Sequence, residues 1–293
     1  MSEEREANTV RPEILHAPSA DASGFAVAAQ PLGLGTRLYG NGAVRKSALL
    51  VLLAAAWEIY ARVLDNPLLF PTFTATLGAL LSGIARGEIP SAGLYTLSLL
   101  LKGYVAGLFF AALLTAFASV SRIGADLLET LTAMFNPLPS IALLPLALIW
   151  FGLGDSSVIF VLVHAVLWAV ALNTFAGFRA LSPTLRMVGQ NYGLSSVSYI
   201  VRILIPGAFP SILTGLKVGW AFAWRTLIAA ELVFGVSSGS GGLGWYIFEN
   251  KNQLRIPEVF AGLLTVIIFG LFVENVIFRT IEQRTVRRWG MQT

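Results

Sequence analysis

The stretch SILTGLKVGWAFAWRTLIAAELVFG, Ser211 to Gly235, decides the fold because its length determines how the adjoining glycines are interpreted. Next comes GSGGLG, Gly239 to Gly244, whose G-x-G-x-x-G spacing cradles a dinucleotide pyrophosphate where it joins a buried strand to a helix. The preceding apolar run, however, is several times longer than an ordinary strand of roughly five or six residues. A bilayer core of about 30 Å requires roughly 20 helical residues. The stretch therefore predicts a membrane-spanning helix, and the glycines its exit loop.

The composition is that of an integral membrane protein. Hydrophobic residues make up 56% of the chain and charged residues 12%, whereas about a quarter of the residues in a soluble domain are charged. Cysteine is absent, which excludes disulfides and thiolate chemistry, and the two histidines are too few for a histidine-built metal site. We do not expect a self-contained redox or zinc enzyme, and we expect no catalytic residue, no cofactor and no metal. The net charge of +4 is explained by the Lys and Arg that membrane proteins collect on their cytoplasmic side. We expect no nucleic-acid partner.

The chain divides into a tail and a membrane domain. Residues 1–44 are polar, without a sustained apolar period, and predict a flexible cytoplasmic tail. The start SEEREANTVRPE is mostly acidic, unlike the basic start and apolar core of a cleavable signal peptide. Residues 45–293 predict a transmembrane domain.

Six spans are predicted, and the fold class is all-α integral membrane. The third span contains Pro145 and adjoins Pro137 and Pro139, which we expect a bundle interior to tolerate. In the second span, Gly103 and Gly107 have the small-xxx-small spacing that permits close helix contact. The predicted spans are 47–64, 94–118, 138–153, 158–178, 212–234 and 259–281.

Basic residues near the spans predict the orientation. With both termini inside, most of them, including the cluster from Arg279 to Arg288, lie on the cytoplasmic side. The GSGGLG loop then faces away from the cytoplasm, where nucleotides are not supplied.

The longest polar interruption, Arg179 to Pro206, separates the fourth and fifth spans. Leu185, Val188 and Tyr192 have helical spacing, Gly193 breaks the run, and a second amphipathic stretch follows. This pattern predicts a helix, a turn and a second helix along the cytoplasmic membrane surface. An interfacial helix that only covers the membrane boundary and a docking surface for a cytoplasmic partner are both compatible with it.

This segment resembles a known family. MVGQNYG, Met187 to Gly193, followed by Ile203, Ile205 and Pro206, is similar to the E-A-A-x-x-x-G-x9-I-x-L-P loop of binding-protein-dependent ABC importer permeases. Further similarities to the nitrate/sulfonate/taurine branch run from about residue 103 to the end of the chain. They are PSIALLPLALIWFG at Pro139–Gly152, NTFAG at Asn173–Gly177, PGAFPSILTGL at Pro206–Leu216, and AAEL followed by GGLG within Ala229–Gly244.

The resemblance implies an architecture and a set of partners. It implies a six-helix permease subunit of the bacterial inner membrane with a core at about 103–288, usually paired as a homodimer. Two ATPase subunits would lie below it and a periplasmic or lipoprotein substrate-binding protein above it. It also implies that the loop is a coupling helix seated on the ATPase. The implied coupling residues are Met187, Val188, Gly189, Tyr192, Gly193, Ile203, Ile205 and Pro206.

Two departures from the family pattern concern this loop. Met187 replaces the family's acidic residue, and Gly189 replaces its second alanine. Docking would then depend more on apolar packing than on charge.

The chain is predicted to be a permease and not an enzyme. It has no G-K-[ST] and no LSGGQ-like sequence, so ATP hydrolysis must come from another polypeptide. Two alternatives are an ion-driven secondary transporter and an intramembrane enzyme. An enzyme would need a catalytic constellation within the spans, which offer only scattered single residues. These are Glu58, His164, Asn173, Glu231 and Glu274.

Arg225, near the middle of the fifth span, needs a partner, because an arginine that faces lipid there costs about 2.5–3.5 kcal/mol. One interpretation is an ion pair with Glu58 or Glu274, or stacking on a tryptophan. The other is a pathway residue for an anionic substrate, which a guanidinium suits. On the same helix, Lys217 would assist exit, and Trp220 and Trp224 would be core residues or an aromatic wall.

Overall fold

The structure, a computed structural model, describes residues 40–234 and 241–288. Every regular element in these ranges is a helix, which confirms the all-helical class. The chain divides into two compact units, residues 1–53 and 54–293. The predicted tail, up to residue 39, lies outside the described residues, as does the start of GSGGLG.

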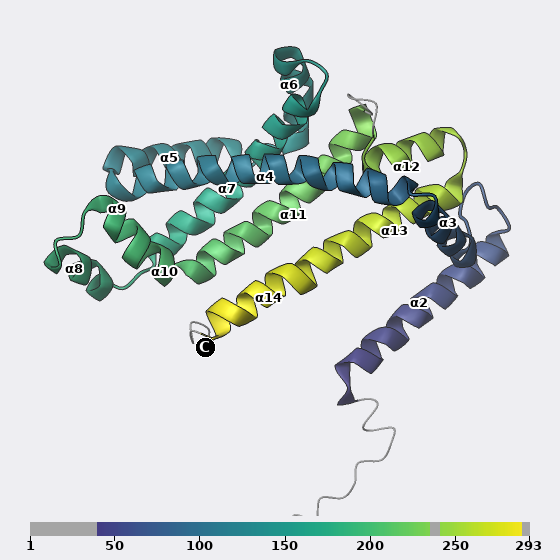
Figure 1. Cartoon of the computed structure of the whole chain (residues 1–293), viewed down its shortest axis with the longest axis horizontal. Coiled ribbons are helices and arrows are strands. Elements are labelled where there is room, and N and C mark those ends of the chain that lie inside the picture. The colour runs from purple at the N-terminus through teal and green to yellow at the C-terminus, as the bar shows by residue number, and fades with distance from the viewer. Residues whose placement is uncertain (1–39, 235–240, 289–293) are drawn as a thin grey trace, which may run out of the picture. The chain divides into compact units, whose positions relative to one another are not determined.

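The helices succeed one another through short connections (Figure 1). The first six are α2 (Gly42–Leu64), α3 (Phe73–Ala85), α4 (Glu88–Val120), α5 (Arg122–Phe135), the 3-10 turn η2 (Ser140–Leu143) and α6 (Leu144–Phe151). Next come α7 (Asp155–Arg179), α8 (Pro183–Asn191), α9 (Ser196–Tyr199), the π-helical η3 (Ile200–Leu204) and α10 (Ile205–Gly207). The last are α11 (Phe209–Phe234), α12 (Leu243–Asn252), α13 (Ile256–Phe272), η4 (Val273–Phe278), α14 (Arg279–Glu282) and η5 (Gln283–Arg287).

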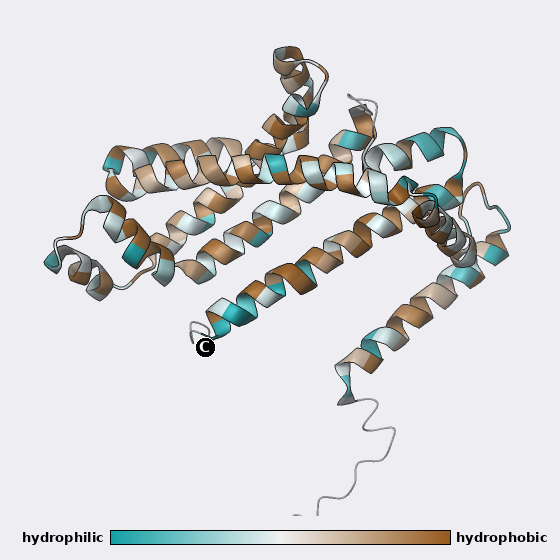
Figure 2. Cartoon of the chain, in the orientation of Figure 1, coloured by the Kyte–Doolittle hydropathy of each residue, from teal (hydrophilic) through white to brown (hydrophobic). Residues whose placement is uncertain are grey.

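Four to six of these segments can cross a membrane. By length and apolar composition, four helical stretches among the described residues suffice alone, and two bent pairs qualify if each counts as one span. The four are 42–64, 88–120, 155–179 and 256–287, and the pairs are 122–135 with 140–151 and 196–207 with 209–233. In Figure 2 the apolar brown residues continue along α13, whereas α12 and the end near α14 carry hydrophilic teal.

The third predicted span, 138–153, is not one straight helix. Its residues form only η2 and α6, and this arm meets α5 at an angle of 88°. Pro137 and Pro139 explain the break, because proline lacks an N–H and disfavours helical backbone in the residue before it. The prediction from hydropathy therefore covers only the second arm of this bent pair.

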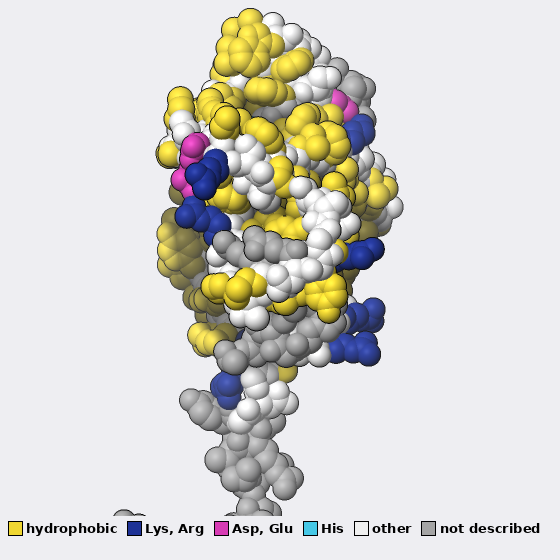
Figure 3. Space-filling view, turned by 90° about the vertical axis from the view of Figure 1, so that its left-hand side faces the viewer, with side chains coloured by type: hydrophobic (Ala, Val, Ile, Leu, Met, Phe, Trp, Pro, Cys, Tyr) yellow, Lys and Arg dark blue, Asp and Glu magenta, His cyan; other side chains and the backbone are white. Residues whose placement is uncertain are grey.

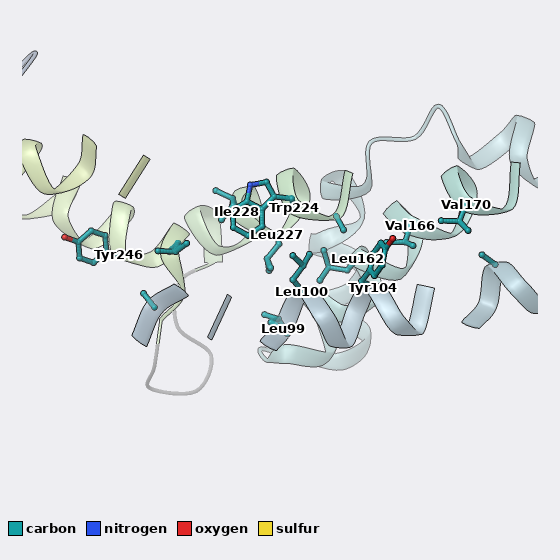
Figure 4. Packing of buried hydrophobic residues seen from close by; sticks show 14 of the residues in the cluster. Leu99, Leu100, Tyr104, Leu162, Val166, Val170, Trp224, Leu227, Ile228 and Tyr246 are labelled. Carbon is teal, nitrogen blue, oxygen red and sulfur yellow. The ribbon is translucent and has the colours of Figure 1, made fainter. Parts of the chain in front are cut away.

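Three helices form the core of the second unit. Leu100 on α4, Leu162 on α7 and Leu227 on α11 are fully buried and converge on one another (Figure 4). The close contact that the spacing of Gly103 and Gly107 permits is present, since a Cβ at Gly103 would lie 2.5 Å from the Cβ of Leu162. At this distance only glycine fits, and α4 therefore lies directly against α7.

Candidate functional site

The segment between α7 and α11 forms the predicted helix, turn and helix. The α8 helix ends with a Schellman-type cap, in which Gly193 has a φ of +61° and the Leu194 N–H donates to the Gly189 carbonyl at 3.2 Å. The Ser195 side chain then accepts from the Ser198 N–H and starts α9. Gly193 is thus required by the left-handed backbone, in agreement with the predicted break at this residue.

Gly189 also has a structural explanation. It is buried, and a Cβ added to it would lie 2.6 Å from Cδ2 of Tyr199. The Tyr199 ring therefore occupies the space that an alanine side chain would need. Glycine replaces the family's alanine at position 189, and the ring of Tyr199, ten positions later in the same loop, fills the space.

The outer side of this loop exposes apolar side chains. Met187 is 53% exposed, Val188 39% and Tyr192 79%, although an isolated protein normally exposes large apolar groups only singly. Figure 3 faces this end of the second unit, where apolar and basic side chains are exposed side by side. The surface offers a partner mainly apolar contact.

The second half of the loop leads into the fifth span through a bend. Ile203 is half-buried, whereas Ile205 and Pro206 are exposed. The segment 196–207 meets 209–233 at 78°. Pro206 lies in the first turn of α10, where its missing N–H is tolerated, and buried Leu204 and Ala208 pack with Phe178 of α7. These contacts fix the direction in which the loop enters α11.

A charged cavity of about 500 Å³ lies beside the loop. It lies between the start of α5 and the end of α7, and Tyr199 of the loop also lines it. Arg179 on α7 pairs with Glu129 on α5, and Arg122 and Asp126 complete its charged lining. Both members of the pair are more than half exposed, so the pair contributes little stability.

The two tryptophans predicted as core or pathway residues pack within the chain. Trp220 meets Tyr104 edge to face, with ring centroids 5.3 Å apart. Trp224 is 8% exposed and stacks on Phe269 of α13 at 4.9 Å. Both therefore pack in the core, and Trp224 also lines a cavity together with Arg225.

Lys217 is tied to the last helix. It forms an ion pair with Glu282 of α14, whose carboxylate also lies 3.6 Å from Arg287. The Lys217 side chain is 36% exposed and that of Glu282 is 18% exposed. The pair joins the first half of α11 to the end of the chain.

Arg225 is exposed and makes no ion pair or hydrogen bond with the described residues. Glu58, one partner considered for it, instead pairs with Arg62 at 2.7 Å and accepts the Thr74 N–H at 3.0 Å. Glu274 lines a cavity of about 520 Å³ together with Arg225 but forms no ion pair with it. Arg225 also lines a second cavity, of about 370 Å³.

The second cavity lies at the break between α5 and η2. Asn136, Ser140 and Thr226 are among its polar lining residues. Ser140 is hydrogen-bonded to Nδ1 of His164 at 3.1 Å, which ties η2 to α7. The break is therefore held by a side-chain contact and does not depend on the proline residues alone.

A buried polar network joins α4, α11 and α12. Glu231, 5% exposed, accepts a hydrogen bond from the Thr96 hydroxyl at 2.9 Å and from the Gly244 N–H at 2.9 Å. The Thr96 oxygen in turn accepts the Leu243 N–H at 2.8 Å. The carboxylate thus occupies the position at the start of α12 where a bound phosphate would lie in a dinucleotide site.

In the sequence, Glu231 stands out only as an isolated acidic residue. A Cβ at Gly244 would lie 2.6 Å from the Cβ of Glu231, and one at Gly242 would meet its carboxylate. The AAEL stretch, which contains Glu231, therefore packs directly against the GGLG stretch, which contains Gly242 and Gly244. Their shared place in the family pattern is a signal for it, but the partner Thr96 is 135 residues away from Glu231 and carries no motif.

The sequence is similar to those of known transport proteins. Residues 103–289 match the family described as "Binding-protein-dependent transport system inner membrane component". The taurine transport system permease protein TauC of Escherichia coli is 29% identical over 231 residues, which cover 77% of this chain and 82% of that protein. The aliphatic sulfonates permease SsuC of the same organism, which is described as putative, is 29% identical over 171 residues, 58% of this chain and 63% of that protein.

A third relative is the nitrate import permease protein NrtB of a Synechocystis species. It is 31% identical over 157 residues, 54% of this chain and 56% of that protein. All three relatives are transport permeases, so this chain is not itself the enzyme of the system. The chain belongs to the family of binding-protein-dependent transport system inner membrane components.

Proposed function

We propose that the chain is the permease subunit of an importer for a small anionic solute, a sulfonate, nitrate, taurine-like or other organic acid. Hydrolysis of ATP is supplied by a separate ATPase, and the solute is delivered by a periplasmic or lipoprotein substrate-binding protein. The names of the relatives support the class of solute. The observation that carries the proposal is the exposed apolar surface of α8, which lies outside the candidate spans and has no cover within the described chain.

The coupling element comprises Met187, Val188, Gly189, Tyr192 and Gly193, continued by Ile203, Ile205 and Pro206. Met187, Val188 and Tyr192 are the apolar contacts to the ATPase. Gly189 and Gly193 set the shape of the loop, because one accommodates the Tyr199 ring and the other supplies the left-handed turn. Ile205 and Pro206 lie at the bend that would pass a displacement of the loop to α11.

Crosslinking tests this docking directly. The chain has no cysteine of its own, so Met187→Cys and Tyr192→Cys each introduce a unique thiol. With a cysteine placed in the ATPase, both variants are expected to form a disulfide-linked product. Lys251→Cys on α12 is the control and is expected to form none. A product from the control alone, or labelling of residues 187 and 192 only from outside, would refute both the docking and the orientation.

The orientation we propose has both termini in the cytoplasm and six spans, with each bent pair counted as one. The distribution of Lys and Arg supports the orientation, and six crossings would return the chain to the side on which it starts. Two copies of the chain form a homodimer around a central pathway. In this organisation, residues 1–44 are a cytoplasmic tail and residues 103–288 are the core of the importer subunit.

Arg225 is the central residue of the proposed pathway. An unpaired guanidinium within a span is costly in lipid, and it is a forked donor for an oxyanion. Trp224 lines the adjoining cavity, Trp220 supports Tyr104, and Lys217 lies nearer the cytoplasmic end. Arg225→Met, assayed for uptake in proteoliposomes with both partners, is expected to lower the rate strongly, whereas Arg225→Lys retains part of it. Uptake by the Arg225→Met variant at the unmodified rate would exclude a pathway role.

A further inference from the structure

Two independent features meet in the 370 Å³ cavity beside Arg225. One is the break after α5, where Pro137 and Pro139 interrupt the helix within a candidate membrane span. Irregular backbone at membrane depth is tolerated where it is buried in protein or lines a water-filled cavity. The other is Arg225 itself, which lines the same cavity from α11. The Arg225 side chain and the break after α5 thus line the same cavity.

The two cavities on either side of Arg225 differ in charge. The 520 Å³ cavity also contains Glu274, and its carboxylate would repel an anion. The 370 Å³ cavity has no carboxylate among its described lining residues, and Arg225 is the one charged residue among them. Of the two, only the smaller cavity therefore presents a net positive field to a solute.

The polar residues of the smaller cavity have donors to spare. Thr226 makes no hydrogen bond with the described residues, whereas the helical threonines Thr214 and Thr265 donate to the carbonyl four residues before them. The side-chain amide of Asn136 likewise has no partner in the described part of the chain. Both side chains line the cavity together with Arg225. Polar groups within a membrane span need partners that lipid does not supply, so this set is suited to a ligand rich in acceptors.

We propose that this cavity is a binding subsite for one small oxyanion, a sulfonate, carboxylate or nitrate. The Arg225 guanidinium donates two parallel hydrogen bonds to it, and the Asn136 amide and the Thr226 hydroxyl donate to the remaining oxygen lone pairs. Ser140 is a positioning residue, because its bond to His164 holds η2 against α7. A volume of about 370 Å³ lies at the small end of the range of ligand pockets and suits a small solute with a few waters.

The subsite deepens the proposed function and rests on it for the direction of transport, but its test does not need the partners. Since the chain lacks cysteine, Thr226→Cys introduces one thiol into the cavity of the purified full-length protein. Its reaction rate is measured with two methanethiosulfonate reagents, one bearing a sulfonate and one bearing a trimethylammonium group. The anionic reagent is expected to react about tenfold faster, after correction for the rates on a free thiol.

Two further variants assign this preference to its source. Arg225→Met in the Thr226→Cys background is expected to abolish the preference, because it removes the cation. Glu274→Gln is expected to leave the preference unchanged, because Glu274 lines the other cavity. An equal effect of both substitutions would mean that the cavities share one field, and the assignment would then be wrong.

Protection by ligands completes the test. Nitrate and methanesulfonate, at constant ionic strength with tetramethylammonium chloride as the reference, are expected to slow labelling at residue 226. Asn136→Leu, which keeps the size of the side chain but not its donor, is expected to weaken that protection several-fold. Equal labelling by both reagents, or no protection by either anion, overturns the subsite. That failure would leave the docking of α8 to the ATPase untouched, because crosslinking tests it separately.

Discussion

The hydroxyl of Thr96 lies between the backbone of Leu243 and the carboxylate of Glu231, 2.8 Å from the one and 2.9 Å from the other. Thr96 is fully buried, and its one proton goes to Glu231 while its oxygen accepts the N–H. Without this hydroxyl, the Glu231 carboxylate would lose a donor and the Leu243 N–H would lose its acceptor. This chain of donors and acceptors is complete, which is the condition for a buried polar network to stabilise a fold.

Removing the carboxylate is expected to destabilise the protein. Glu231→Ala leaves the Gly244 N–H and the Thr96 hydroxyl without their acceptor, at a cost of about 2 kcal/mol or more. Thermal unfolding of the full chain in nanodiscs measures the loss. Glu249→Ala, on the exposed side of α12, is the matched control and is expected to change stability by less than about 0.5 kcal/mol. Equal shifts for the two variants would contradict a structural role for the network.

Restoring the family's alanine in the loop is expected to impair it. Gly189→Ala places a methyl group against the Tyr199 ring, so α8 must shift away from α9. Stimulation of the ATPase by the permease should fall, with little change in global stability. The double variant with Tyr199→Leu should recover most of the stimulation, because the smaller side chain frees the space. Failure of this second substitution to rescue would show that the contact does not govern the loop.

The ion pair between Lys217 and Glu282 separates a structural role from a pathway role. Lys217→Met leaves a partly buried carboxylate with only the more distant Arg287 and is expected to lower the unfolding temperature. The charge-swapped double variant, Lys217→Glu with Glu282→Lys, should regain stability. If Lys217 also assists an anion, the swapped protein assembles but transports slowly. Normal transport by the swapped protein would limit Lys217 to the ion pair.

Tyr246 on α12 predicts a loss of stability at alkaline pH. Burial raises the pKa of its hydroxyl, and the nearby carboxylates of Glu88 and Glu258 act in the same direction. The unfolded chain releases this proton near pH ~10 and the folded chain only above that, so stability falls as the pH rises through this range. Tyr246→Phe should flatten the pH profile of unfolding in that alkaline range. At neutral pH it should cost little, because the hydroxyl has no hydrogen-bond partner among the described residues.

Most of the spans can be predicted from the sequence, because a long apolar run has few solutions in a bilayer. The predicted ranges at 94–118, 158–178 and 212–234 lie within α4, α7 and α11. The third range, 138–153, misses the bend at Pro137 and Pro139 and the arm before it. Hydropathy indicates which residues are apolar but not in which direction the chain runs. That direction is set by contacts such as Ser140 with His164, which join residues distant in sequence.

Less of the site was predictable. The spacing of Leu185, Val188 and Tyr192, with the break at Gly193, was enough to predict the helix and turn. No local pattern shows that Gly189 faces Tyr199, since this depends on how two helices fold back on each other. Similarly, Arg225 is conspicuous because a charge in a span is costly, whereas Asn136 and Thr226 are common residues whose joint position appears only in three dimensions.

During synthesis, the members of the network around Glu231 and Thr96 are made in a fixed order. Thr96 leaves the ribosome first, Glu231 is second, and the amides of Leu243 and Gly244 come last. When the ribosome has just completed α11, the Glu231 carboxylate therefore still lacks one of its two donors, the Gly244 N–H. Only the arrival of α12 completes its coordination. A chain arrested before residue 241 would retain a carboxylate that lacks the Gly244 N–H donor.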